Sequence, residues 1–66
     1  MIIQISPNEW VNVRELESIE IRSNSDNKFY LVIKDAMKIY SYHSAAFCNQ
    51  AIARSFAKSI VAKLNG

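Results

Sequence analysis

The last third of the chain carries the pattern that most restricts the fold. Large apolar residues recur there at every fourth position: Ile52, Phe56, Ile60 and Leu64. On a helix with 3.6 residues per turn, this spacing places them on one face. We therefore predict one long amphipathic helix from Ser44 to Leu64, with the Ser44 hydroxyl as its N-cap.

Asn49 interrupts the apolar face one turn after Ser44, and three interpretations are open. Its side chain can lie in water beyond the edge of the sheet, or it can be buried with a backbone hydrogen bond. It can also cap a helix that begins there, with residues 44–48 as an irregular lead-in. At the other end, Asn65-Gly66 suits the left-handed turn that closes many helices.

The face opposite the apolar stripe is built mostly of small residues. Small side chains let a second backbone come close, so this face predicts either a helix–helix contact or an ordinary helix surface. Its members are Cys48, Ala51, Ser55, Ser59 and Ala62.

The first two thirds of the chain contain short β-branched or aromatic runs separated by turn residues. They predict extended segments at 2–5, 10–13, 18–22, 29–33 and 38–42. Strict alternation over 18–22 indicates a strand with one buried face, and the unbroken apolar run 29–33 indicates a strand covered on both faces. The predicted fold class is α+β. It is an antiparallel β-meander of 4–5 short strands with one C-terminal α-helix packed on the sheet, in a single domain of residues 1–66.

A turn at residues 34–37 predicts a hairpin in which Ile33 pairs with Lys38. In this register both hairpin faces are apolar, and one helix can cover only one of them. An uncovered apolar face is typical of an interaction site. We therefore expect a homodimer, unless the N-terminal strands cover this face. The candidate protein-binding residues are Trp10, Tyr30, Val32, Ile39, Ala51 and Ser55.

Composition and charge argue against several other classes of protein. Half of the residues are hydrophobic (50%), which argues against disorder, and no stretch is long enough for a membrane span. The single cysteine fits a reducing cytoplasm. Residues 1–27 hold five acidic and two basic residues (−3), and residues 28–66 hold six basic residues and one acidic residue (+5). These halves can attract a charged partner or another copy, or they can neutralise each other.

One family resemblance rests on the segment Glu9-Trp10-Val11-Asn12-Val13 and the following Ile19-Glu20-Ile21. With a polar turn, two further strands and a C-terminal helix, the chain resembles short bacterial and phage proteins of uncharacterised function. Their order of elements is similar to a reduced pleckstrin-homology-type module. The resemblance implies a β-meander plus helix and assigns no functional residue.

The sequence predicts no catalytic residue, cofactor or metal site. His43 and Cys48 lack an orienting third group, and the scattered carboxylates are typical of a solvated surface. We expect a non-enzymatic protein-binding or regulatory module that acts as a cytoplasmic homodimer. A phage or mobile-element accessory protein that inhibits a host component would fit this description. The alternative is a nucleic-acid-binding protein that uses the basic residues Arg54, Lys58, Lys34 and Lys38.

Overall fold

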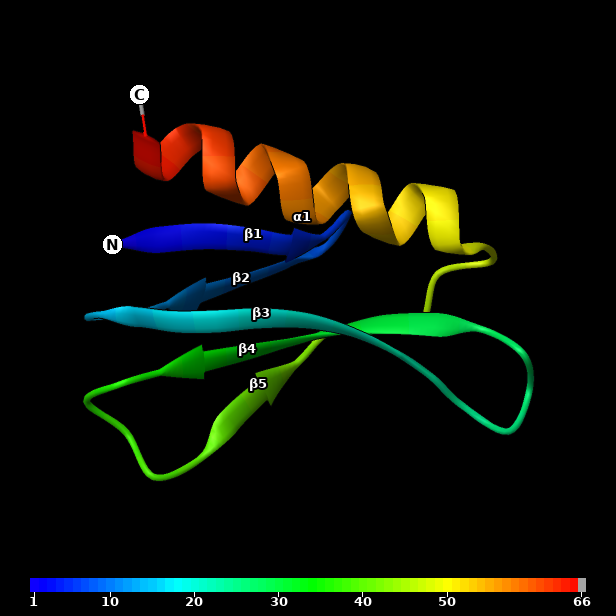
Figure 1. The fold of residues 1–66 in the computed structure, drawn as a ribbon, viewed down its shortest axis with the longest axis horizontal. Helices are drawn as coiled ribbons and strands as arrows, with labels where there is room; N and C mark the ends of the chain where they lie inside the picture. Colours follow the sequence, from blue (N-terminus) through cyan, green and yellow to red (C-terminus); the bar gives the residue numbers. More distant parts are fainter. Residues whose placement is uncertain (66) are drawn as a thin grey trace.

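A computed structural model describes residues 1–65, in which five strands precede one helix (Figure 1). The strands are β1 (Ile2–Ser6), β2 (Glu9–Asn12), β3 (Leu16–Ser23), β4 (Phe29–Asp35) and β5 (Ser41–His43), and the helix is α1 (Gln50–Asn65). The predicted α+β class, with short antiparallel strands and a C-terminal helix packed on them, is confirmed. The predicted cap at Gly66 lies outside the described residues.

The strands divide between two antiparallel sheets. β1 and β2 form a hairpin, and β3, β4 and β5 form a second sheet with β4 in the centre. Side chains alternate between the two faces of a strand, so Ile19 and Ile21 of β3 share the inner face of the second sheet with Leu31 and Ile33 of β4. The helix α1 lies along the inner side of both sheets and packs on β1, β4 and β3. In Figure 1 it runs alongside β1.

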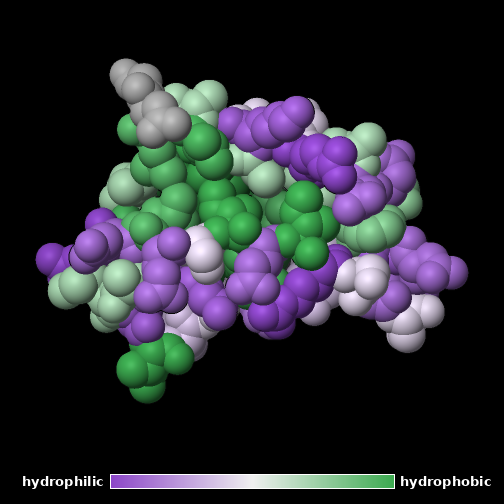
Figure 2. All heavy atoms as spheres, viewed as in Figure 1, coloured by the Kyte–Doolittle hydropathy of each residue, from purple (hydrophilic) through white to green (hydrophobic). Residues whose placement is uncertain are grey.

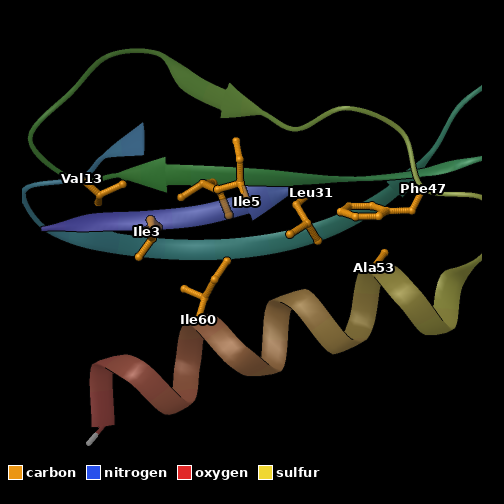
Figure 3. Close-up of a cluster of buried hydrophobic side chains, with 8 residues drawn as sticks. Ile3, Ile5, Val13, Leu31, Phe47, Ala53 and Ile60 are labelled. Atoms are coloured by element: carbon orange, nitrogen blue, oxygen red, sulfur yellow. The ribbon is translucent and has the colours of Figure 1, made fainter. Parts of the chain in front are cut away.

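One hydrophobic core joins both sheets to α1. In Figure 3, Ala53 and Ile60 point from α1 towards the strands. Burial of each large aliphatic side chain contributes about 1.5–3 kcal/mol, so this cluster is the main stabilising feature of a small chain. Its buried members are Ile3, Ile5, Val13, Leu31, Ile33, Phe47, Ala53 and Ile60.

Asp35 ties the linker between the two sheets to the end of β4. Its carboxylate, in a residue that is only 2% exposed, accepts backbone N–H bonds from Arg14 (2.8 Å), Met37 (3.0 Å) and Glu15 (3.1 Å). Burial favours the neutral acid, but these bonds favour the carboxylate and bring the pKa of Asp35 below its ordinary value of 3.8. Asp35 therefore fixes the point where the chain passes from one sheet to the other.

The helix begins later than predicted. Residue Ser44 is not its N-cap, because the Ser44 N–H donates to the Leu31 carbonyl and the Ser44 hydroxyl accepts from the Leu31 N–H. The chain stays extended along β4 as far as Phe47, which exchanges two backbone hydrogen bonds with Phe29. Asn49 then caps the helix, since its side-chain oxygen accepts from the Ile52 N–H at 2.9 Å. The third interpretation of Asn49 is therefore the observed one.

The predicted register of the last hairpin is wrong by four residues. Ile33 pairs with Tyr42 instead of Lys38, because residues 36–40 form a longer loop. The Asp35 carboxylate and carbonyl hold the start of this loop by accepting from Met37 and Lys38 N–H groups. As a consequence, Ile39 lies in the loop and is fully exposed.

The outer face of the second sheet is polar, which corrects the prediction of an apolar second face. Val32 is 1% exposed and stands directly opposite Glu20 and His43 on the neighbouring strands. The Glu20 carboxylate lies 3.0 Å from Arg22 and 3.3 Å from Lys34. Hydrogen bonds from Arg22, and then from Lys34, lower the pKa of Glu20. Charged side chains thus surround Val32, so a partner is not needed to cover it.

The Asn49 cap gives a direct test of the helix start. Asn49→Ala removes the side-chain acceptor and is expected to lower the free energy of unfolding by about 1 kcal/mol, whereas Asn49→Asp keeps an acceptor and stays close to wild type. Thermal unfolding followed by circular dichroism measures this difference as a Tm shift of about 4–8 °C. Equal losses in the two variants would contradict the cap.

The hydrogen bonds of Asp35 predict how stability depends on pH. Because the folded pKa lies below the unfolded one, the carboxylate stabilises the fold above about pH 4, and this contribution disappears as the pH falls through the folded pKa. Asp35→Asn is expected to be less stable at about pH 7 and to lose less stability than wild type on acidification to about pH 2.

Urea denaturation over this pH range is the measurement for Asp35, and Glu20→Gln is the matched control. Glu20 also has a lowered pKa, but its side chain is 38% exposed and its ion pairs are screened by water. We expect Glu20→Gln to keep most of the acid sensitivity of wild type. If Asp35→Asn and wild type lose stability in parallel, the carboxylate does not act as described.

Candidate protein-binding surface

A groove opens between α1 and the edge strand β3, and we call it the α1–β3 groove. Its volume is about 390 Å³. Figure 2 shows hydrophobic side chains gathered in a band between α1 and the strands, with hydrophilic side chains on both sides of the band. Most of the lining residues are aliphatic, and the two others, Arg54 and Lys58, are positively charged. The lining residues are Ile19, Ile21, Arg54, Ala57, Lys58, Val61 and Ala62.

The position of α1 explains why the groove exists. A helix about 10 Å across covers about two strands that lie 4.8 Å apart. Ala53 and Ile60 share the buried core with residues of β1 and β4, whereas Ile19 and Ile21 of β3 are only partly buried against it. The helix side above β3 carries the small residues Ala57 and Ala62, and Val61 remains 46% exposed. Part of the inner face of β3 is therefore open to solvent.

The backbone of β3 adds a second feature to the groove. Within residues 1–65, β3 pairs with β4 alone, so its other edge carries unpaired N–H and C=O groups. The pairing shifts register between Leu16 and Ser18, which places a bulge at the start of the strand. From Ser18 to Ser23 the pairing is regular. An extended peptide can form a new ladder along this regular part of the edge.

The rim of the groove is positively charged. Arg54 and Lys58 are exposed on α1, and the helix contains no acidic residue that could neutralise them. The ion pairs found among residues 1–65 join Glu20 to Arg22 and to Lys34, on the outer face of the sheet. The two helix cations are thus available to a negatively charged ligand at the groove.

A smaller depression of about 270 Å³ lies on the other side of α1, beside β1. Ser55, Ser59 and Lys63 of the helix and Gln4 of β1 give it a more polar lining. The strand beneath it is also shorter, since β1 has 5 residues and β3 has 8. The α1–β3 groove therefore offers more apolar contact and a longer edge than this depression.

The predicted protein-binding residues do not form one surface. Val32 is buried, and Tyr30 is half-buried with its ring 5.6 Å from that of His43. Trp10 is 59% exposed on the outer face of the β1–β2 hairpin, opposite Gln4. Ile39 is in the loop after β4. The remaining two residues, Ala51 and Ser55, are exposed on α1 and do not line the α1–β3 groove.

The basic residues of the nucleic-acid hypothesis are also separated. Arg54 and Lys58 lie together at the groove, on the inner side of the sheet. Lys34 stands on the outer face, where it pairs with Glu20. Lys38 is in the loop, where its ammonium donates to the Tyr40 hydroxyl at 3.3 Å and this bond raises the pKa of Lys38. Four phosphate contacts on one continuous surface are therefore not available from this set.

Sequence reasoning did not single out the aliphatic residues of the groove. The alternation of Ile19 and Ile21 was visible and correctly indicated an inward-facing pair. Whether the strand lies at the edge of a sheet depends on the pairing of other segments, which the alternation does not report. Val61 sits beside the apolar stripe of α1, and only the position of the helix shows that it is left exposed.

Residues with chemical reactivity are not gathered into a site. His43 stacks near Tyr30, and the free thiol of Cys48 is exposed before the helix begins. Among residues 1–65, no group of three His, Cys, Asp or Glu side chains is placed to hold a metal ion. In the same part of the chain, no helix has the length and apolar character needed to cross a membrane.

Comparison with known proteins finds no matching family model, no matching curated protein and no matching solved structure. The resemblance to short bacterial and phage proteins therefore stays a prediction, and function has to be inferred from the surface itself.

Proposed function

We propose that this chain is a small, non-enzymatic protein-binding module and that the α1–β3 groove is its contact surface. The observation that carries the proposal is an exposed aliphatic lining beside an unpaired strand edge. Full burial of an aliphatic side chain contributes about 1.5–3 kcal/mol, so a partner that covers Val61, which is 46% exposed, gains about half of this amount. Apolar contact in the groove and main-chain hydrogen bonds along β3 are the two kinds of contact on which peptide recognition by strand addition depends, and both support the proposal.

The setting that we propose is the cytoplasm, which fits the free and exposed thiol of Cys48. The mode of action that we propose is steric: the module covers part of a cellular component, as an accessory protein of phage or mobile-element type would do. Self-association into a homodimer through the same groove is the second form that this proposal can take. Both forms depend on the same residues, so one pair of variants tests them.

The groove variant is Val61→Asp. It places a carboxylate in the aliphatic lining of the groove, at a position that is exposed to solvent. The matched control is Ser55→Asp, which puts the same charge on the exposed helix surface away from the groove. Substitutions at exposed positions usually change the free energy of unfolding by about 0.5 kcal/mol or less. Both variants are therefore expected to keep the helical signal of wild type and a Tm within a few degrees of it.

We expect immobilised wild type and Ser55→Asp to retain the same specific partner from extracts of the source cells, and Val61→Asp to lose most of it. Sedimentation of the three proteins over a concentration series measures the homodimer in parallel. Equal retention and equal solution mass for Val61→Asp and Ser55→Asp would show that the groove is not the contact surface.

A further inference from the structure

We infer that the α1–β3 groove takes an extended, acidic segment of a partner protein, which adds as a strand to the free edge of β3. This inference rests on the proposed protein-binding function and names the chemistry of the partner. Three observations support it: the free edge of β3, the aliphatic lining beneath α1 and the two cations on the rim.

The free edge defines the shape of the ligand. A strand that pairs with β3 lies about 4.8 Å from it and turns alternate side chains to each face of the sheet. The inner-face side chains of such a strand enter the space beside Ile19 and Ile21, beneath α1. A helical ligand would leave unpaired those N–H and C=O groups of residues 18–23 that point away from β4, whereas an extended ligand can pair with them.

The lining defines the inward side chains of the ligand. The groove volume of about 390 Å³ falls within the roughly 300–1,000 Å³ that is usual for pockets that bind a ligand closely. Its walls are Ile19, Ile21, Ala57, Val61 and Ala62, and none of these side chains can form a hydrogen bond. The inward-pointing positions of the ligand that lie beside Ile19, Ile21 and Val61 are therefore aliphatic.

The rim defines the charge of the ligand and distinguishes a foreign segment from a second copy. Arg54 and Lys58 stand on the side of α1 that faces the open edge of β3. If two copies paired through β3 about a two-fold axis, their helices would face each other with Arg54 and Lys58 opposed and no helix carboxylate between them. A segment that carries Asp or Glu at the inward-facing positions two residues before and after its aliphatic ones places these carboxylates on the same side of the sheet as Arg54 and Lys58 and pairs with both cations instead.

The test uses synthetic peptides slightly longer than the regular part of β3, with valine at the central inward-facing positions and threonine at every outward-facing position. One peptide carries glutamate at the two inward-facing positions that flank the valines, and a second carries lysine at those two positions. A third is the glutamate peptide with N-methyl groups on alternate amides, which removes the donors needed for strand addition. Amide NMR titrations of the intact chain, at low and high salt, give both the affinities and the residues that respond.

We expect the glutamate peptide to bind about tenfold more tightly than the lysine peptide at low salt, because each cation adds a modest, partly exposed ion pair. The shifts should centre on Ile19, Ile21 and Val61, the preference should weaken with salt, and the N-methylated peptide should not bind. The double variant Arg54→Glu, Lys58→Glu should reverse the preference towards the lysine peptide. Its circular dichroism spectrum serves as the folding control.

Equal binding of the glutamate and lysine peptides, or unchanged binding after N-methylation, would overturn the inference. If no peptide binds while wild type forms a dimer that Val61→Asp disrupts, the groove joins two copies of this chain. That result overturns the acidic partner and leaves the protein-binding function intact. If no peptide binds and Val61→Asp matches Ser55→Asp in retention and in mass, both the inference and the proposed function fail.

Discussion

A single helix has to shelter the inner faces of five strands, and this constraint shapes the whole molecule. The width of a helix matches about two strands. The chain places α1 over β1 and β4, where Ala53 and Ile60 meet the side chains of both sheets. The β1–β2 hairpin supplies the rest of the cover through Ile3 and Ile5. The strand left at the margin is β3, and the groove follows directly from that arrangement.

Local sequence patterns predicted which helix and strands form. They did not predict where the helix begins or which residues of the last hairpin pair. The fourfold spacing on the helix and the alternation around Ile19 and Ile21 depend on local periodicity, and both identified their elements correctly. The helix start depends on Phe47, which stays extended because it pairs with Phe29 and contributes to the core. The hairpin register depends on Asp35, whose carboxylate accepts from Arg14 and Glu15 in the linker between the sheets as well as from Met37 at the start of the loop. Contacts between residues that are far apart in the sequence therefore determine both the start of the helix and the register of the hairpin.

The candidate site was less predictable than the fold for a related physical reason. An unbroken apolar run such as Phe29–Ile33 indicates burial on both faces, but it does not say what covers each face. On the outer face, Val32 is surrounded by the Glu20 ion pairs and by the Tyr30–His43 contact. The apolar run predicts that a second subunit or the N-terminal strands cover this face, whereas the cover of Val32 comes from the neighbouring strands β3 and β5. The surface that does remain open contains residues from β3 and from the flank of α1, which only the tertiary arrangement brings together.

The free edge of β3 also has a consequence for solubility. Unpaired strand edges invite pairing with unfolded or misfolded chains, and proteins blunt them with bulges and charges. β3 has a bulge at its start and carries Glu20 and Arg22 on its outer face. Beneath α1, however, Ile19 and Ile21 have no such protection. The stretch of backbone that we propose for partner binding is therefore also the stretch that is most open to aggregation, and a bound partner strand would pair the free groups and close this edge.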